Sequence, residues 1–224
     1  MKKRVYVPEV ESELRRRSVS MPQIIRDASG IIILNKRIKS LIFSTDVAVI
    51  QNSNPDAVMA VYPFTPTLTI TQALMSSSFV PLFIGVGGGL TSGNRSIYLA
   101  LQAELLGAYG VVVNAPMQNE VIEEMSQALD IPVVATVVSE NDDLDGKAKA
   151  GAKIFNVSGG KNTIGIIKKV RDMFGKEFPI IATGGKTEQS IAETIAAGAN
   201  AITYTPPSSA EIFSSVMRNY REIR

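Results

Sequence analysis

The sequence predicts an α/β protein of a single domain, a (β/α)8 TIM barrel preceded by a short N-terminal extension. Two observations carry this prediction. From residue 40 onward, short apolar runs alternate with segments of helical spacing, and eight such runs are present. Most of the runs are continuously apolar, as expected of parallel strands whose two faces are both buried. The length of 224 residues suits one barrel with a sizeable core.

The predicted strands leave room for one helix after each of them. They span residues 40–46, 57–64, 81–86, 110–114, 132–138, 154–158, 179–183 and 201–205. Gly107, Gly151 and Gly198 each stand before an alanine and a strand. Each of these glycines fits the left-handed position that follows the end of a helix. Residues 208–211, with the sequence Ser-Ser-Ala-Glu, predict a capping box at the start of the last helix.

We predict an N-terminal extension of residues 1–39 and a barrel of residues 40–224. Within the extension, Ser20 and Pro22 predict a short helix with serine as its N-cap and proline at its first position. The apolar residues 30–34 and the segment 37–39 predict a hairpin that turns at Asn35 and Lys36. We expect this element to close the bottom of the barrel.

Composition excludes several kinds of chemistry. The chain contains neither cysteine nor histidine. Disulfides, thiol chemistry, a Ser-His-Asp triad and histidine-ligated zinc or iron are therefore excluded. Any catalysis must use Asp, Glu, Lys, Tyr, Ser or backbone dipoles.

The charge pattern argues against a basic nucleic-acid binder, because the net charge is only +2. Basic runs occur at residues 2–4 and 15–17. They favour a solvated surface, and an arm that binds RNA or a membrane is the alternative. No secretory signal and no apolar stretch long enough to cross a bilayer is recognisable. We therefore expect a cytoplasmic protein without a membrane partner.

Two glycine doublets point to the ligand. Gly159-Gly160 follows the sixth predicted strand, and Gly184-Gly185 follows the seventh. A strand, a glycine turn and a helix place backbone N–H groups at a helix N-terminus, where they can bind an anion. After the late strands of a barrel, this is the usual position of a phosphate. Tight turns without a ligand are the alternative for either doublet alone.

The stretch from about Gly151 to Phe213 resembles the phosphate-binding (β/α)8 superfamily. The resemblance rests on Gly-Ala-strand-Ser-Gly-Gly, followed by strand-Thr-Gly-Gly-helix-Ala-Gly-Ala and a last strand. Members of that superfamily include thiamine-phosphate synthase, N-acylglucosamine-6-phosphate epimerase, keto-deoxy-phosphogluconate aldolase and the glycerol-operon antiterminator protein. The order of motifs is specific for the superfamily and does not select a member.

The resemblance implies a set of phosphate-binding positions in this chain. They are Thr183, Gly184, Gly185, Thr205 and Ser208. The glycine turn after the sixth strand adds Ser158, Gly159 and Gly160. The chain departs from the pattern at Pro206-Pro207, because proline has no N–H to offer. The position that corresponds to the Schiff-base lysine of the aldolase is Asn156, so we expect no imine chemistry at this site.

Carboxylates are the candidates for acid or base catalysis. Asp46 ends the first predicted strand, on the face where barrels place catalytic groups. Its alternative role is to cap the next helix. Glu140 follows the fifth strand, close to Asp142, Asp143 and Asp145. This loop favours the acidic first turn of a helix, and a Mg²⁺ site or a general base is the alternative.

Amide side chains are the candidates for orienting a substrate. Asn114 and Asn156 both end predicted strands. Asparagine is disfavoured in strands, which favours a hydrogen-bonding role toward a ligand. Gly87, Gly88 and Gly89 follow the third strand, where they either admit a substrate to the backbone or form a flexible loop.

These patterns together favour a barrel that binds a small phosphorylated metabolite, such as a sugar phosphate or a nucleotide. The leading hypothesis is an enzyme, with isomerase, lyase and phosphate-ester hydrolase left open. The alternative is a regulatory barrel that senses such a ligand and binds RNA, similar to the antiterminator proteins. Homo-oligomers are compatible with both hypotheses.

Overall fold

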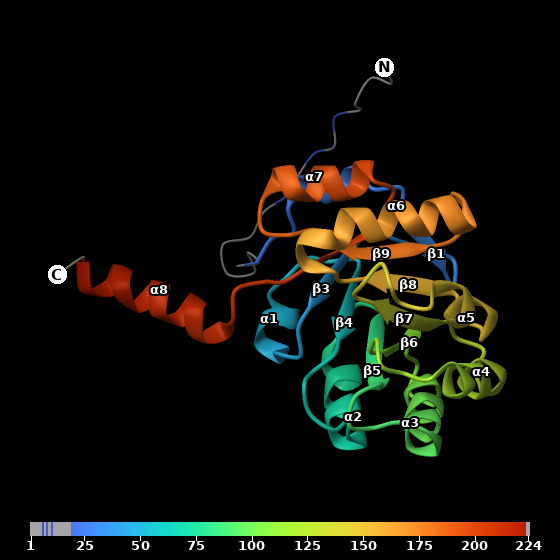
Figure 1. Ribbon diagram of the computed structural model, residues 1–224. Coiled ribbons are helices and arrows are strands. Elements are labelled where there is room, and N and C mark those ends of the chain that lie inside the picture. Colours follow the sequence, from blue (N-terminus) through green and yellow to red (C-terminus); the bar gives the residue numbers. More distant parts are fainter. Residues whose placement is uncertain (1–5, 7, 9, 11–18, 223–224) are drawn as a thin grey trace.

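The computed structural model describes residues 6, 8, 10 and 19–222, so both basic runs lie outside the described residues (Figure 1). Eight parallel strands form a closed barrel in the order β10-β3-β4-β5-β6-β7-β8-β9. The strands are β3 (Ser40–Phe43), β4 (Ala57–Ala60), β5 (Leu82–Gly87), β6 (Gly110–Val113), β7 (Val133–Val137), β8 (Ile154–Val157), β9 (Ile180–Thr183) and β10 (Ala201–Tyr204). This architecture confirms the predicted (β/α)8 fold.

Each barrel strand is followed by a helix. These are α1 (Val47–Gln51), α2 (Leu68–Ser77), α3 (Asn94–Leu105), α4 (Asn119–Ala128), α5 (Leu144–Lys149), α6 (Thr163–Phe174), α7 (Glu188–Ala196) and α8 (Ser209–Glu222). Gly107, Gly151 and Gly198 follow helix ends with φ of 95°, 102° and 118°. These values confirm their predicted left-handed positions.

Buried residues form two clusters, one on each face of the strands. The interior cluster includes Leu41, Phe83 and Ile181, and the outer cluster, between strands and helices, includes Ile42, Ile84 and Ala182. Neighbouring residues of one strand thus alternate between the two clusters, as the period of two in a strand requires. Both faces of the barrel wall are therefore apolar, which explains the continuous apolar runs in the sequence.

A hairpin closes the N-terminal end of the barrel. It consists of β1 (Ile31–Ile33) and β2 (Lys36–Ile38), and its buried isoleucines belong to the interior cluster. The predicted turn at Asn35 and Lys36 is wrong by one residue. Leu34 and Asn35 form the turn, with φ of 46° and 64°, because Ile33 pairs with Lys36. Positive φ at both central residues is the geometry that two-residue hairpin turns favour.

The segment before the hairpin packs on the outside of the barrel. Val19, Met21 and Ile25 belong to the outer cluster, and the 3₁₀ helix η2 (Gln23–Asp27) contacts α7. The predicted helix start is corrected by one position. Pro22 precedes the helix as its N-cap, and no side chain caps it.

The last helix leaves the barrel. Figure 1 shows α8 running away from the body of the molecule, beyond α1. None of its residues is buried. Its start confirms the predicted capping box, because Ser208 Oγ accepts from Glu211 N at 3.2 Å and the Glu211 carboxylate accepts from Ser208 N at 2.7 Å.

Candidate functional site

Polar side chains replace apolar ones inside the barrel near the C-terminal ends of β7 to β10. Thr136, Asn156, Thr183 and Thr203 each lie two residues after a member of the interior cluster. They therefore face the barrel interior. Thr136 is the register partner of Asn156, and Thr183 is the partner of Thr203. Four successive strands thus present hydroxyl and amide groups below the barrel mouth.

Much of this polar surface has hydrogen-bonding capacity to spare. Asn156 Nδ2 donates to Thr136 Oγ1 at 3.3 Å, and Thr183 Oγ1 donates to Ser158 Oγ at 3.3 Å. Thr203 Oγ1 is buried and finds no partner in the part of the chain that the structure describes. A buried hydroxyl without a partner is costly. A polar ligand at the mouth would supply the missing interaction.

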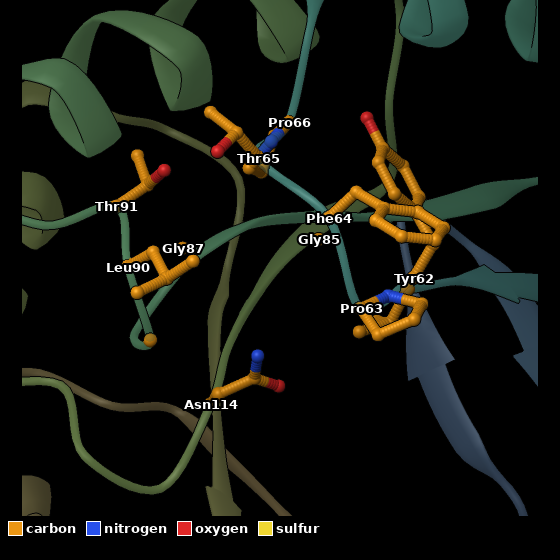
Figure 2. Close-up of a pocket in the computed structure, with 12 residues that line it drawn as sticks. Tyr62, Pro63, Phe64, Thr65, Pro66, Gly85, Gly87, Leu90, Thr91 and Asn114 are labelled. Carbon is orange, nitrogen blue, oxygen red and sulfur yellow. The ribbon is translucent and has the colours of Figure 1, made fainter.

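A cavity of about 180 Å³ opens on the other side of the mouth, at the ends of β4, β5 and β6. Figure 2 shows the Asn114 side chain pointing into the space between the two loops that follow β4 and β5. The side-chain amide of Asn114 makes no hydrogen bond to any of the described residues, so it is available to a ligand. The residues that line the cavity are Val61, Tyr62, Pro63, Phe64, Thr65, Pro66, Gly85, Gly87, Gly89, Leu90, Thr91 and Asn114.

Glycine allows the loop after β5 to lie close to Asn114. Gly88 has a φ of 104°, and a Cβ added there would lie 2.6 Å from the backbone nitrogen of Asn114. The contact is fixed by a hydrogen bond from Asn114 N to Gly87 O at 2.9 Å. The glycine run in the sequence was a signal for this site, whereas nothing in the sequence predicted the loop from Tyr62 to Pro66 as its opposite wall.

The two glycine doublets form strand-to-helix turns as the sequence predicted. Gly159 N donates to Thr163 Oγ1 at 3.1 Å, so this amide is already engaged. Gly160 and Gly185 have φ of 58° and 78°, and their N–H groups donate to no acceptor within the described residues. A Cβ at Gly184 would meet Ile191 and Ile202. Gly184 therefore faces the helix layer, and Gly160 and Gly185 are the amides left for an anion.

The turn after β10 offers less to an anion. Thr205 and Ser208 are exposed. The N–H and the hydroxyl of Ser208 both donate to the Glu211 carboxylate, at 2.7 and 2.8 Å. These bonds lower the pKa of Glu211, the N–H of Ser208 contributing most. A phosphate at Ser208 would meet this negative charge.

Asp46 has the capping role that the sequence left as its alternative. Its Oδ1 accepts from Ala48 N at 2.9 Å and from Val49 N at 3.2 Å, which caps α1. Its pKa is lowered, first by a hydrogen bond from the Ser209 hydroxyl and further by the amides of Val49, Ala48 and Ser209, against an opposing effect of burial. The net effect is that the ionised form of Asp46 is stabilised.

The acidic loop after β7 is engaged in local structure. Asp142 Oδ2 accepts from Val138 N at 2.7 Å, Asp143 caps α5 by accepting from Gly146 N at 2.9 Å, and Asp145 pairs with Lys149 at 2.6 Å. Glu140 is exposed, and its carboxylate lies beside Gly165 of α6. In the described part of the chain, no group of three or more acidic side chains is placed to hold a metal ion.

A buried lysine lies behind the cavity, and the sequence analysis did not single it out. Lys147 is only 5% exposed. Its Nζ donates to Ala115 O at 3.0 Å and to Met117 O at 3.3 Å. Burial lowers the pKa of Lys147, while Asp142 and Asp143 oppose this effect. This side chain holds the segment that immediately follows Asn114.

Comparisons with known proteins identify the fold. No protein-family model matches the sequence, and no curated protein matches it. A phosphonopyruvate hydrolase in complex with oxalate and Mg²⁺ aligns with a TM-score of 0.61 at 16% identity, over 90% of this chain and 86% of that chain. A phosphoenolpyruvate phosphomutase from Streptomyces platensis subsp. rosaceus aligns with a TM-score of 0.57 at 14% identity, over 88% and 83%.

A mandelate oxidase with an FMN adduct aligns equally well, with a TM-score of 0.61 at 14% identity, over 80% of this chain and 68% of that chain. Proteins of different chemistry therefore reach similar scores, and the likeness shows a TIM barrel without selecting an activity. Membership of the phosphate-binding superfamily stays a prediction. None of the helices in the described residues combines the length and apolar character needed to cross a bilayer.

Proposed function

We propose that this chain is a TIM-barrel enzyme that binds a small phosphorylated metabolite across the barrel mouth. The observation that carries the proposal is the pairing of two unused polar surfaces. The amides of Gly160 and Gly185 lie on one side with Thr183 and Ser158, and the Asn114 amide faces a cavity on the other. The phosphate would bind the glycine turns, and the rest of the metabolite would enter the cavity.

The amide and hydroxyl groups suit this division of roles. Backbone N–H groups before a helix bind phosphate through their dipoles without a charged side chain. Asn114 and Asn156 would then orient the metabolite by hydrogen bonds, each offering both donors and an acceptor. Some titratable side chain must still transfer the proton in an acid-base reaction.

Asp46 and Glu140 are the candidates that we propose for that transfer. The lowered pKa of Asp46 keeps it ionised near neutral pH. It would therefore act as a base rather than as an acid. Its hydrogen bonds to α1 and Ser209 would have to loosen for it to reach a substrate. The reaction type, whether isomerisation, elimination or phosphate-ester hydrolysis, follows from the identity of the metabolite.

The similar phosphonopyruvate hydrolase binds Mg²⁺, but the side chains at this mouth do not fit that ion well. Mg²⁺ in proteins is usually held by one or two carboxylates together with water and substrate oxygens. Here the polar side chains that face the interior are Thr136, Asn156, Thr183 and Thr203. The carboxylate of Asp46 caps α1, and that of Glu140 lies beside Gly165 of α6. The acidic loop residues Asp142, Asp143 and Asp145 are bonded elsewhere. We therefore derive no step through a metal.

Calorimetry with inorganic phosphate, followed by a panel of sugar phosphates and nucleoside monophosphates, tests the proposal. Thr183→Val keeps the side-chain shape and removes the hydroxyl. We expect it to weaken phosphate binding by about tenfold or more, the scale of one hydrogen bond to a charged group. Thr65→Val is the matched control, because it makes the same chemical change on the cavity side of the mouth, away from the glycine turns.

Asn114→Leu separates the two halves of the site. We expect unchanged affinity for inorganic phosphate and weaker binding of the complete metabolite. Phosphorus NMR of the panel with the wild-type protein then detects turnover. Absence of phosphate binding, or equal loss in Thr183→Val and Thr65→Val, would overturn the proposed placement.

A regulatory binding protein is the second candidate. The observation that favours it is that Asp46, Asp142, Asp143 and Asp145 all serve helix caps, a loop or an ion pair. Such a protein would bind a panel member without changing it. Loss of RNA binding on removal of residues 1–17 would then support regulation through the basic arm.

A further inference from the structure

We infer that α8 pairs with the α8 of a second copy of this chain, in an antiparallel arrangement, to form a homodimer. The starting observation is that α8 stands off the barrel in Figure 1 and buries none of its residues. Val19, Met21 and Ile25 of the N-terminal segment are buried in the outer cluster instead. Within α8, Ile212 is half-buried against the outer cluster, and Phe213, Val216 and Tyr220 are left exposed.

The exposed helix carries an apolar stripe. Ile212, Phe213, Val216 and Tyr220 follow one another at intervals that place them on the same side of a helix. Phe213 is 67% exposed and Tyr220 is 62% exposed. A helix with such a stripe gains stability only when the stripe is covered.

The stripe is complementary to itself. Val216 lies near the middle of α8, and Ile212 and Tyr220 lie four residues before and after it. A two-fold axis at Val216 sets Ile212 of each copy against Tyr220 of the other. Such an isologous contact closes at two copies.

Charge favours the antiparallel direction. Glu211 lies in the first turn of α8, and Arg221 lies in the last turn. Arg218 and Arg221 outweigh Glu222 near that end, which leaves it positive. Antiparallel pairing places the acidic end of one helix beside the basic end of the other and opposes the two helix dipoles. Parallel pairing would set like ends together.

The proposed contact between two α8 helices would also involve the barrel next to α8. A largely apolar groove of about 200 Å³ lies between α1 and the first half of α8. It is lined by Val19, Ala48, Val49, Ile212, Phe213 and Val216, together with the polar residues Asn52 and Ser209. It is continuous with the stripe, so a second α8 laid along the stripe also fills the groove. A membrane surface fits less well, because α8 carries Glu211 and Glu222 against Arg218 and Arg221 and so lacks the cationic excess of interfacial helices.

Cysteine chemistry gives a direct test, because the chain has no cysteine of its own. Under mild oxidation we expect Val216→Cys to form a disulfide between copies, since the two-fold axis brings identical residues together. Ser214→Cys is the control that stays unlinked, because Ser214 lies two residues from both Ile212 and Val216 and therefore on the other side of the helix. A mixture of Ile212→Cys and Tyr220→Cys chains should link, and Ile212→Cys alone should not.

Light scattering coupled to size exclusion supplies the second measurement. The wild-type protein should have about twice the mass of the 24.1 kDa chain, across a concentration series. Phe213→Glu should run as a monomer with an unchanged circular dichroism spectrum of the barrel, and Ser214→Glu should stay dimeric. A monomeric wild type, an unlinked Val216→Cys, or binding of α8 to anionic lipid vesicles in place of dimerisation would overturn the inference.

Discussion

The carboxylate of Asp46 joins the first and last helices of the barrel. It accepts hydrogen bonds from Ala48 and Val49 at the start of α1 and from Ser209, the first residue of α8. One side chain at the end of β3 therefore caps one helix and anchors the base of another. The contact with Ser209 links the start of α8 to the start of α1.

We expect Asp46→Ala to lower the free energy of unfolding by about 0.5–2 kcal/mol, the usual cost of removing an N-cap. Asp46→Asn keeps an oxygen acceptor and should retain most of this stability. Urea unfolding of the three proteins at neutral pH measures the difference. If Asp46→Ala and Asp46→Asn are equally destabilised, the charge rather than the cap is what matters.

The stability that Asp46 contributes should depend on pH. Because the pKa of Asp46 is lower in the folded protein than its ordinary value of 3.8, the folded state binds this proton less readily than the unfolded state. The stabilisation is therefore complete above pH 3.8 and is lost as the pH falls through the lower folded value. The difference in free energy of unfolding between wild type and Asp46→Ala should therefore shrink over this acidic range. A gap that stays constant to the lowest pH would contradict the lowered pKa.

The fold was predictable because the barrel imposes local patterns. Strands buried on both faces need continuous apolar runs, and Gly107, Gly151 and Gly198 stop their helices in a conformation that favours glycine. The glycine doublets and Asn114 could be placed at strand ends for the same reason. The role of Asp46 as a cap could be stated as an alternative, because the residue type alone fits both a cap and a base.

Other features depend on contacts that no local pattern shows. The cavity joins the loop of Tyr62 to Asn114, which only the closure of the barrel brings together. Lys147 is charged and stands on a short helix, a pattern that favours solvent, yet it is buried against two carbonyls. The stripe of α8 is what any barrel helix would have, so the sequence could not predict that this helix leaves the barrel.

Adjacent glycines after β5 offer a matched pair of variants. A Cβ at Gly88 would lie 2.6 Å from Asn114 N, whereas a Cβ at Gly89 would meet nothing within 4 Å. We expect Gly88→Ala to cost about 1–3 kcal/mol through backbone strain and overpacking. Gly89→Ala should change stability by less than about 0.5 kcal/mol. Thermal unfolding compares them, and equal melting temperatures would show that the loop tolerates a shift away from Asn114.

Arg171 of α6 should be a major contributor to stability. Its guanidinium donates to Gly198 O at 2.6 Å, to Phe178 O at 2.6 Å and to Asn200 Oδ1 at 2.7 Å. Arg171→Met leaves the carbonyl oxygens of Gly198 and Phe178 without this donor, while Asn200 Oδ1 keeps its hydrogen bond from Ile180 N. We expect a loss of about 3 kcal/mol. Lys168→Met, an exposed change on the same helix, should cost less than about 0.5 kcal/mol. Urea denaturation of both variants checks the difference, and a loss in Arg171→Met no larger than the control would contradict this role.

The buried Lys147 should contribute to the stability of the folded protein. Replacing it with Met leaves the carbonyl groups of Ala115 and Met117 without this donor, at a cost of about 1–3 kcal/mol. Lys149→Met is the control, because it removes only an exposed ion pair with Asp145, and exposed ion pairs contribute little to stability. Both variants remove one positive charge from α5, but Lys147 is buried and Lys149 is exposed.

Burial lowers the pKa of Lys147 below its ordinary value of 10.5, so the folded protein releases this proton at a lower pH than the unfolded chain. Between the two pKa values the unfolded state binds more protons, and the stability of the wild type rises with pH relative to Lys147→Met. Urea unfolding should be measured from neutral pH up to pH 10.5, the ordinary pKa of lysine. Over this range the difference in free energy of unfolding between wild type and Lys147→Met should widen. A gap that narrows over this range would mean that Asp142 and Asp143 stabilise the ammonium ion more than burial destabilises it.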